Sequence, residues 1–201
     1  MQPYISHLSK DKKLKKLIDE QDEFKLRRRK NVPLALCSSI MSQQLSVKVA
    51  DVIYRRFLDL YGKKEPTPQD ILDTPSEKLR AIGLSNAKVS YIKNVAQFAI
   101  EHGMDEKKLS KMSDEEVIDY LTPIKGVGRW TVEMLLIFTL GREDVFALDD
   151  LGVQNGMIKH YRLDNTNKKQ FRETMTKRSL KWSPYRSYVC LLFWGWKDRG
   201  V

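Results

Sequence analysis

Apolar positions recur every three or four residues along most of the chain, while the strict alternation typical of strands is scarce. Tyr91, Ile92, Val95 and Phe98 follow the helical spacing, and Ser85 precedes them as a capping residue. Two earlier segments, 34–40 and 49–60, predict a pair of helices separated near residues 42–46. The pattern therefore predicts an all-α protein.

Several short segments carry the residues that start helices. Thr67-Pro68-Gln69-Asp70 and Thr74-Pro75-Ser76-Glu77 each place a threonine before a first-turn proline and an acid. Ser113-Asp114-Glu115-Glu116 is a capping box before an apolar stretch. Loops are short, with no repeat and no low-complexity tract. We expect a single domain over residues 1–201, with lobes of about 60–140 and 1–59 plus 141–201.

Charge favours an anionic partner. The chain has 36 Lys and Arg against 26 Asp and Glu, a formal net charge of +10. The basic residues concentrate in 10–30 and 168–199, although a solvated basic surface remains the alternative. The apolar stretch 189–196 is too short to span a bilayer, and no signal-like segment precedes the charged residues 1–30. A cytoplasmic location, nucleoid-associated if bacterial, is the default expectation.

The segment 121–131 predicts a helix, a tight turn and a second helix. Gly126 and Gly128 allow positive φ and close approach of the backbone to another surface. Val127 between them anchors the turn, and Thr131 follows in the second helix, whose first N–H groups suit an anion. This is a helix-hairpin-helix signature for phosphate contact without sequence readout, with an ordinary helical turn as the alternative.

A pair of acids, Asp149 and Asp150, follows twenty residues after Trp130. The simple interpretation is helix capping, with Asp149 just before or at the helix start. Two neighbouring carboxylates are more than one cap requires.

Together these segments resemble the helix-hairpin-helix DNA glycosylase superfamily, in its 3-methyladenine DNA glycosylase II branch. The resemblance covers roughly residues 30–198 and rests on four further stretches in addition to the acid pair: the Gly-Val-Gly-Arg-Trp-Thr hairpin, Ser42-Gln43-Gln44-Leu45-Ser46, the Gly-Leu-Ser-x-x-Lys-x-x-Tyr-Ile segment from Gly83, and Trp182-Ser183-Pro184-Tyr185-Arg186-Ser187-Tyr188. It implies a compact two-lobed helical fold with a DNA cleft between the lobes. The chain before Asn31 is too short for the N-terminal α/β domain of larger bacterial relatives. Two cysteines, Cys37 and Cys190, cannot supply a four-cysteine iron–sulfur cluster and read as buried thiols.

The resemblance also implies site residues. Asp150 maps to the catalytic aspartate. The implied base pocket comprises Trp130, Trp194 and Tyr185, and the implied wedge that fills the duplex is Gln44 with Leu45. The implied phosphate contacts are Gly126, Gly128, Arg129 and Thr131. A structural Na⁺ or K⁺ would bind the backbone carbonyls of Thr122, Ile124 and Gly126, and no other cofactor is required.

These features predict a monofunctional glycosylase that flips alkylated purines, such as 3-methyladenine and 7-methylguanine, out of double-stranded DNA and hydrolyses the N-glycosidic bond. The resemblance places a Schiff-base lysine of bifunctional relatives at position 130, where this chain has tryptophan. We expect a monomer without lyase activity and without a membrane partner. A non-catalytic DNA-binding module and a glycosylase for a different damaged base remain alternatives.

Overall fold

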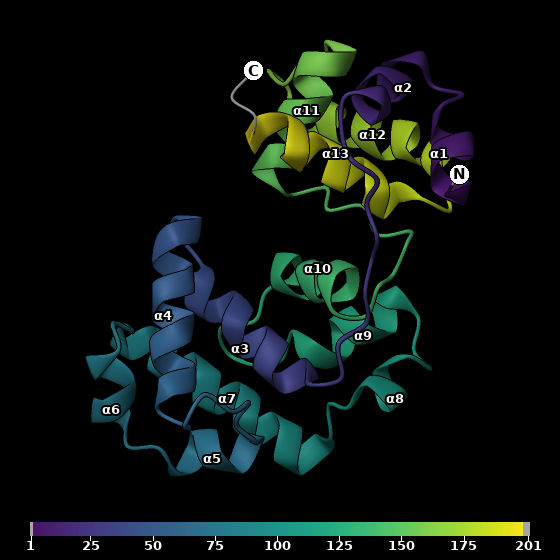
Figure 1. Ribbon diagram of the computed structural model, residues 1–201. Helices are drawn as coiled ribbons and strands as arrows, with labels where there is room; N and C mark the ends of the chain where they lie inside the picture. The colour runs from purple at the N-terminus through teal and green to yellow at the C-terminus, as the bar shows by residue number, and fades with distance from the viewer. Residues whose placement is uncertain (1, 199–201) are drawn as a thin grey trace. The chain divides into compact units, whose positions relative to one another are not determined.

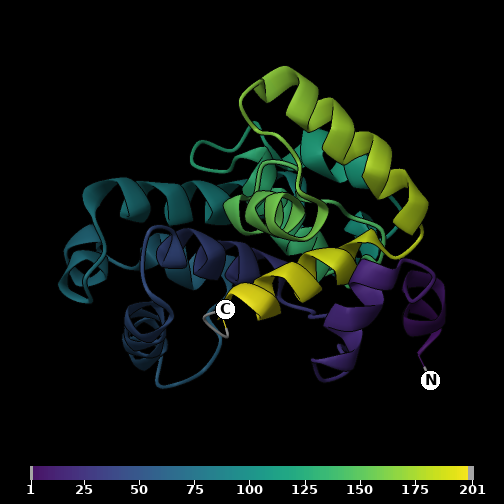
Figure 2. The ribbon, with the colours of Figure 1, turned by 90° about the horizontal axis from the view of Figure 1, so that it is seen from above.

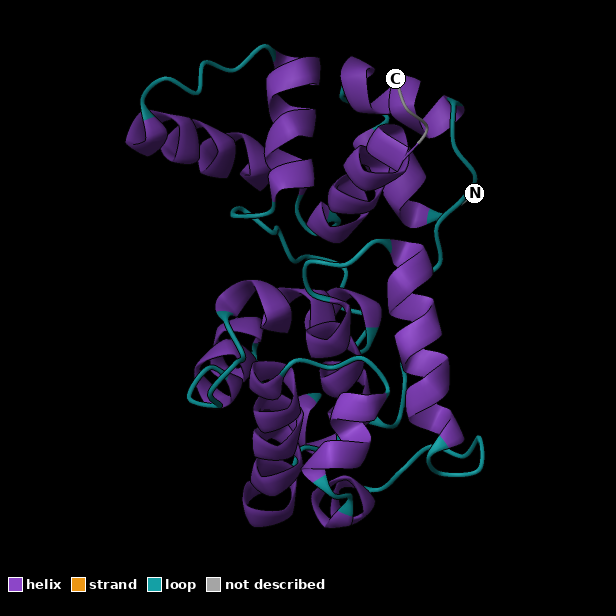
Figure 3. Cartoon of the chain, turned by 90° about the vertical axis from the view of Figure 1, so that its left-hand side faces the viewer, coloured by secondary structure: helices purple, strands orange, loops and turns teal. Residues whose placement is uncertain are grey.

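The computed structural model describes residues 2–198, which form helices joined by loops (Figure 3). Within that range no residue is assigned to a strand, so the all-α prediction is confirmed. The chain divides into two units, one of residues 1–27 with 141–201 and one of residues 28–140. Met1 and residues 199–201, which the predicted domain includes, lie outside the described residues.

The unit of residues 28–140 is built on α3 and α7. Helix α3 packs against α4, α7 and α10, and α5 packs along α7 (Figure 1). Leu36, Ile40 and Ile92 are fully buried at this centre. The helices are α3 (Val32–Ser42), α4 (Val47–Asp59), α5 (Pro68–Asp73), α6 (Ser76–Ala81), α7 (Asn86–His102), α8 (Glu106–Leu109), α9 (Asp114–Leu121) and α10 (Arg129–Phe138).

The other unit is built on α13, which packs against α11 and α2 (Figure 2). Phe193 of α13 is fully buried and makes an edge contact with Trp182, a core aromatic residue with 2% of its surface exposed. The elements are α1 (Pro3–Leu8), α2 (Lys12–Asp19), α11 (Leu151–Tyr161), α12 (Lys168–Ser179), the 3₁₀ turn η1 (Leu180–Trp182) and α13 (Arg186–Asp198).

Helix starts agree closely with their sequence signals. Thr67 and Ser113 form capping boxes at α5 and α9, and Ser85 caps α7 by accepting from the N–H of Lys88. At α6 the cap position falls on Pro75 instead of Thr74, one residue later than predicted. These starts are local because the cap and the N–H group that it satisfies lie within one turn.

The structure places residues 28–59 with 60–140, and not with the chain ends as expected. The reason is the apolar character of α3, since Leu36, Cys37 and Ile40 are completely buried and α3 packs on α7 and α10. Burial raises the pKa of the Cys37 thiol to about 12, and the other cysteine, Cys190, is a buried free thiol in α13. Among residues 2–198, no helix combines the length and the apolar character that crossing a membrane requires.

Candidate active site

Asp150 is the N-cap residue of α11. Its Oδ1 accepts a hydrogen bond from the backbone N–H of Val153 at 2.9 Å. The same oxygen accepts from Nε1 of Trp194 at 2.7 Å. Two N–H donors on one oxygen fix the plane of this half-buried carboxylate. The cap and the indole therefore hold the acid that the sequence predicts as catalytic.

The neighbouring acid has a different role from the one expected. Asp149 is exposed and pairs with Arg172 of α12. The prediction that Asp149 caps the helix is wrong, because Asp150 itself occupies the N-cap position. One doublet thus supplies a surface ion pair and a fixed carboxylate.

A glycine in the first turn of α11 lets Trp194 reach Asp150. A Cβ atom at Gly152 would lie 2.7 Å from Cδ1 of Trp194 and 3.0 Å from Oδ1 of Asp150. Gly156, one turn later, is as close to Phe193, where a Cβ would lie 2.3 Å from the ring. The two glycines therefore let α11 and α13 pack closely together. This close packing places the indole of Trp194 beside Asp150.

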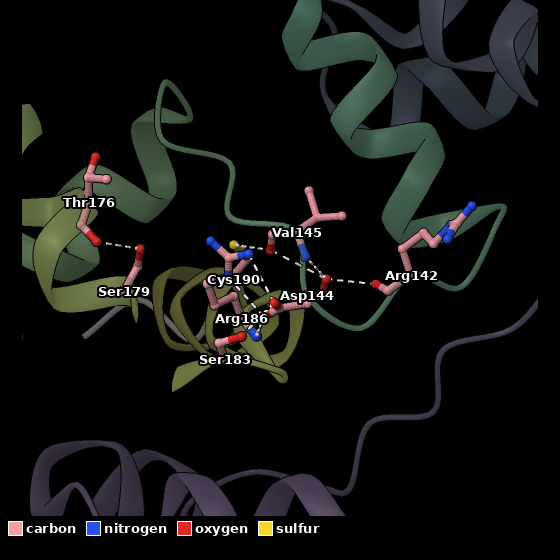
Figure 4. A network of polar contacts seen from close by, with 9 residues as sticks. Arg142, Asp144, Val145, Thr176, Ser179, Ser183, Arg186 and Cys190 are labelled. Carbon is pink, nitrogen blue, oxygen red and sulfur yellow. Dashed lines mark hydrogen bonds and ion pairs between the residues drawn. The ribbon is translucent and has the colours of Figure 1, made fainter. Parts of the chain in front are cut away.

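The loop that leads to Asp150 is tied to the start of α13 (Figure 4). Arg186 donates to both oxygens of Asp144, at 2.8 and 2.9 Å, and the hydroxyl of Ser183 donates to Oδ2 at 2.7 Å. Ser187 accepts from the N–H of Val145 and donates to a carbonyl of the same loop. Burial acts to raise the pKa of Asp144, but the hydrogen bonds and charge of Arg186 hold that pKa below its ordinary value. Arg186 is thus committed to positioning this loop.

Tyr185 lies just before α13 and contacts two other aromatic rings. Its ring makes edge contacts with His7 and Tyr188. Tyr185 also precedes Trp194 by nine residues, which corresponds to about 13 Å along a helix. The role of Tyr185 in the base pocket stays a prediction.

The hairpin between α9 and α10 is built as the two glycines predict. Gly126 has φ +100°, and a Cβ there would lie 2.2 Å from Cγ of Tyr91. Gly128 is the N-cap of α10, and a Cβ there would meet nothing within 4 Å. Gly126 is therefore required by the fold, whereas Gly128 leaves open space beside the first N–H groups of α10.

Arg129 and Thr131, two of the predicted phosphate contacts, have side chains that already bind other residues. The guanidinium of Arg129 binds Glu115 at 2.9 Å and Glu133 at 3.1 Å, which raises its own pKa and lowers that of Glu115. Arg129 thus braces α9 and α10 through two carboxylates, and its contact to a phosphate stays a prediction. The Thr131 side chain is 3% exposed and accepts from Nε2 of Gln43, so only its backbone N–H remains a predicted phosphate donor.

The predicted wedge lies in the loop between α3 and α4. Gln44 is exposed and has φ +60°, an unusual conformation for a residue other than glycine. Lys88 of α7 holds this loop by donating to the carbonyls of Met41 and Gln43, at 2.8 and 2.7 Å. Leu45 is half-buried beside Gln44. Gln44 thus stands at the tip of a loop whose base is fixed.

Trp130 lies in the first turn of α10, with 38% of its surface exposed. A large indole so exposed next to an open helix start is consistent with the predicted contact to a base. Its unit also contains the hairpin and the wedge loop, whereas Asp150 and Trp194 belong to the other unit.

Comparison with known proteins shows the family of this chain. The model for HhH-GPD superfamily base excision DNA repair proteins matches residues 37–182. The chain belongs to this family. It is 36% identical over 185 residues to DNA-3-methyladenine glycosylase 1 of Schizosaccharomyces pombe, covering 91% of this chain and 80% of that protein.

Solved structures extend the likeness to the whole fold. One is the S. pombe 3-methyladenine DNA glycosylase in complex with abasic DNA, with a TM-score of 0.85, 34% identity, and coverage of 96% of this chain and 95% of that one. Another is a DNA-3-methyladenine glycosidase from Bacillus halodurans, with a TM-score of 0.81, 33% identity, and coverage of 100% and 90%. The predicted family and fold class are confirmed.

Two positioning residues of this HhH-GPD protein were not singled out for that role by the sequence. They are Gly152, which admits Trp194, and Asp144, which holds the loop before Asp150. Only the Gly-x-x-x-Gly spacing of Gly152 and Gly156 gave a readable signal for a close helix contact.

Proposed function

We propose that this HhH-GPD protein is a monofunctional DNA glycosylase that removes alkylated purines, such as 3-methyladenine and 7-methylguanine, from double-stranded DNA. The observation that carries the proposal is the fixed carboxylate of Asp150, whose Oδ1 takes both the N-cap hydrogen bond and the indole N–H of Trp194. A simple cap has no need of the second donor. The named relatives from S. pombe and B. halodurans support the substrate class.

The chemistry needs one negative charge near the sugar. When the bond between C1′ and the purine nitrogen breaks, its electron pair goes to the base, and a cationic alkylated purine leaves as a neutral molecule. Positive charge then builds on the deoxyribose, where the carboxylate of Asp150 stabilises it. Water adds at C1′ and loses a proton to the solvent, so that an abasic site remains.

Trp194 serves this step in two ways. Its indole N–H holds Oδ1 of Asp150 at 2.7 Å. Its electron-rich ring offers a stacking face for an electron-poor alkylated base. The half-buried position of the indole suits a residue that must contact a ligand and the core at once.

The other unit supplies DNA binding and base flipping. The open space at Gly128 lets a backbone phosphate approach the N–H groups of the first turn of α10, including that of Thr131. Gln44, at the tip of the α3–α4 loop, fills the place of the flipped nucleotide, with Leu45 behind it. Trp130 on α10 contributes to holding the base. The protein acts on its duplex as a monomer.

The hairpin carbonyls suit a monovalent cation. The carbonyl oxygens of Thr122, Ile124 and Gly126 would hold it, because Na⁺ and K⁺ are coordinated by oxygen ligands of this kind. The carbonyl of Ile124 also accepts from the N–H of Val127 at 2.9 Å, and its second lone pair stays available for such an ion. A cation here would stiffen the turn and add positive charge beside the phosphate.

The test is to incubate the protein with duplexes that each carry one lesion and to identify the free base. The panel contains 3-methyladenine, 7-methylguanine, an oxidised purine and a deaminated base. Release of the two methylated purines with an intact abasic strand is the expected result. Release of another base alone would overturn the substrate class, and tight binding with no release would support a DNA-binding module instead.

The same reactions test for lyase activity. A lysine Schiff base is trapped covalently by borohydride. Because position 130 is tryptophan, we expect no trapped complex and no strand cleavage. A trapped complex would contradict the monofunctional mechanism.

A further inference from the structure

A cavity in the unit of residues 1–27 and 141–201 has the character of an anion site. It has a volume of about 350 Å³ and lies between the α1–α2 turn and the end of α12. Its lining includes His7, Lys10, Asp11, Arg178, Lys181 and Trp182. Three cationic side chains thus face a single carboxylate, before any charge on His7 is counted.

The carboxylate in this cavity is already satisfied by the protein. Oδ1 of Asp11 accepts from the N–H of Lys13 at 3.0 Å. Oδ2 accepts from the hydroxyl of Tyr161 at 2.8 Å and from Nε1 of Trp182 at 3.4 Å. Neutral groups, and not the basic residues of the cavity, therefore supply these hydrogen bonds to Asp11.

Arg178 is held in place but one of its donors is unsatisfied. Its guanidinium lies 4.4 Å from the centre of the Tyr161 ring. Its Nε is buried and has no hydrogen-bond partner among residues 2–198. A buried guanidinium N–H normally has an acceptor, so an unsatisfied one beside a cavity indicates a place for one.

His7 of α1 also has a buried nitrogen, its Nε2, without a hydrogen-bond partner among the described residues. This nitrogen donates when it carries the proton. Two unpartnered nitrogens from α1 and α12, with Lys10 and Lys181 exposed at the same cavity, match the several oxygens of one tetrahedral anion.

We propose that this cavity binds a phosphate group, with Arg178 and His7 as the inner donors and Lys10 and Lys181 as the outer charges. A backbone phosphate of DNA and a free phosphate or nucleotide share this chemistry. The site uses none of the residues assigned to base release, so it stands or fails independently of Asp150.

The direct test follows the ¹⁵N resonance of the Arg178 side-chain Nε–H in the full chain. Inorganic phosphate is added in one arm and an undamaged duplex in the other, with chloride at matched ionic strength as the reference. We expect the Arg178 signal to move and saturate. Saturation with both would assign the site to DNA phosphate, and saturation with inorganic phosphate alone would assign it to a free ligand.

Two variants distinguish binding at this cavity from a general effect of positive charge. Arg178→Met keeps an aliphatic stem over Tyr161 and is expected to weaken the binding in the responding arm by about tenfold. Because this variant lacks the Arg178 signal, binding to the variants and to the parent is measured by calorimetric titration. Lys177→Gln, an exposed neighbour on α12 outside the cavity, is the matched control and is expected to bind as the parent does. If neither phosphate nor duplex moves the Arg178 signal beyond the chloride reference, or if the two variants behave alike, the proposal is overturned. Melting curves of both variants check that each is folded.

Discussion

At the scale of single residues, Asp150 combines an observed structural role with the proposed catalytic one. Its N-cap position fixes the carboxylate with a backbone N–H, and the indole of Trp194 adds a second donor to the same oxygen. The sequence predicted the acid, but it assigned the capping role to Asp149. That assignment could not be made correctly from the pair alone, because the choice depends on which residue lies one position before the first helical turn.

The two hairpin glycines are expected to respond differently to alanine. Gly126→Ala should destabilise the protein by about 1–3 kcal/mol, because the position has φ +100° and a Cβ would collide with Tyr91. Gly128→Ala should change stability by less than about 0.5 kcal/mol, since its Cβ meets nothing.

In DNA binding, by contrast, Gly128→Ala should have a clear effect. Gly128→Ala should weaken duplex binding by about tenfold, because its methyl group would occupy the space that a phosphate needs. Denaturant unfolding and duplex titration measure the two effects. Equal DNA affinity of Gly128→Ala and the parent would remove this helix start from the phosphate contact.

At the scale of elements, local signals were readable and distant contacts were not. Thr67, Ser85 and Ser113 mark helix starts because a cap and its N–H partner are three residues apart. Arg186 binds Asp144, which lies 42 positions away in the sequence, and the residues around each of them do not indicate its partner. The recognised motif predicted that Arg186 matters, while the structure shows what it holds.

The Arg186–Asp144 pair predicts a pH dependence of stability. Its partners hold the folded-state pKa of Asp144 below the ordinary 3.8, so the pair stabilises the protein above about that pH. The contribution is lost as the pH falls through the lower folded-state pKa. Asp144→Asn should therefore lower the free energy of unfolding by about 1–3 kcal/mol at neutral pH.

The difference between Asp144→Asn and the parent should shrink as the pH falls well below 3.8, since the parent carboxyl then also becomes neutral. Denaturant unfolding at neutral pH and at the lowest pH where both proteins fold measures this change. A difference that stays constant over the whole range would show that charge is not the source of the stabilisation.

At the scale of the whole molecule, composition predicted the partner class but not the boundary between units. The net charge of +10 indicates an anionic partner, and family membership agrees with DNA. The boundary at residue 28 was missed because α3 is almost wholly apolar, and apolar character alone does not say which unit will bury a helix.

The same charge predicts a steep dependence of DNA binding on salt. The logarithm of the affinity for an undamaged duplex should fall linearly with the logarithm of the salt concentration, with a slope of about −0.9 for each phosphate neutralised. The backbone donors of α10 carry no full charge, so Gly128→Ala should lower affinity and leave the slope unchanged. A slope near zero would exclude phosphate contacts by the basic side chains.

The most direct test compares Asp150→Asn with the parent in single-turnover release of 3-methyladenine. Asparagine is as good an N-cap as aspartate and can accept from Val153 and Trp194, so the fold and the binding of abasic-site DNA should persist. The rate of base release should fall on the order of 10²-fold or more, because the charge opposite the sugar is gone. Asp149→Asn, the exposed neighbour, should keep the parent rate. Release by Asp150→Asn at the parent rate, with DNA binding intact, would contradict the account.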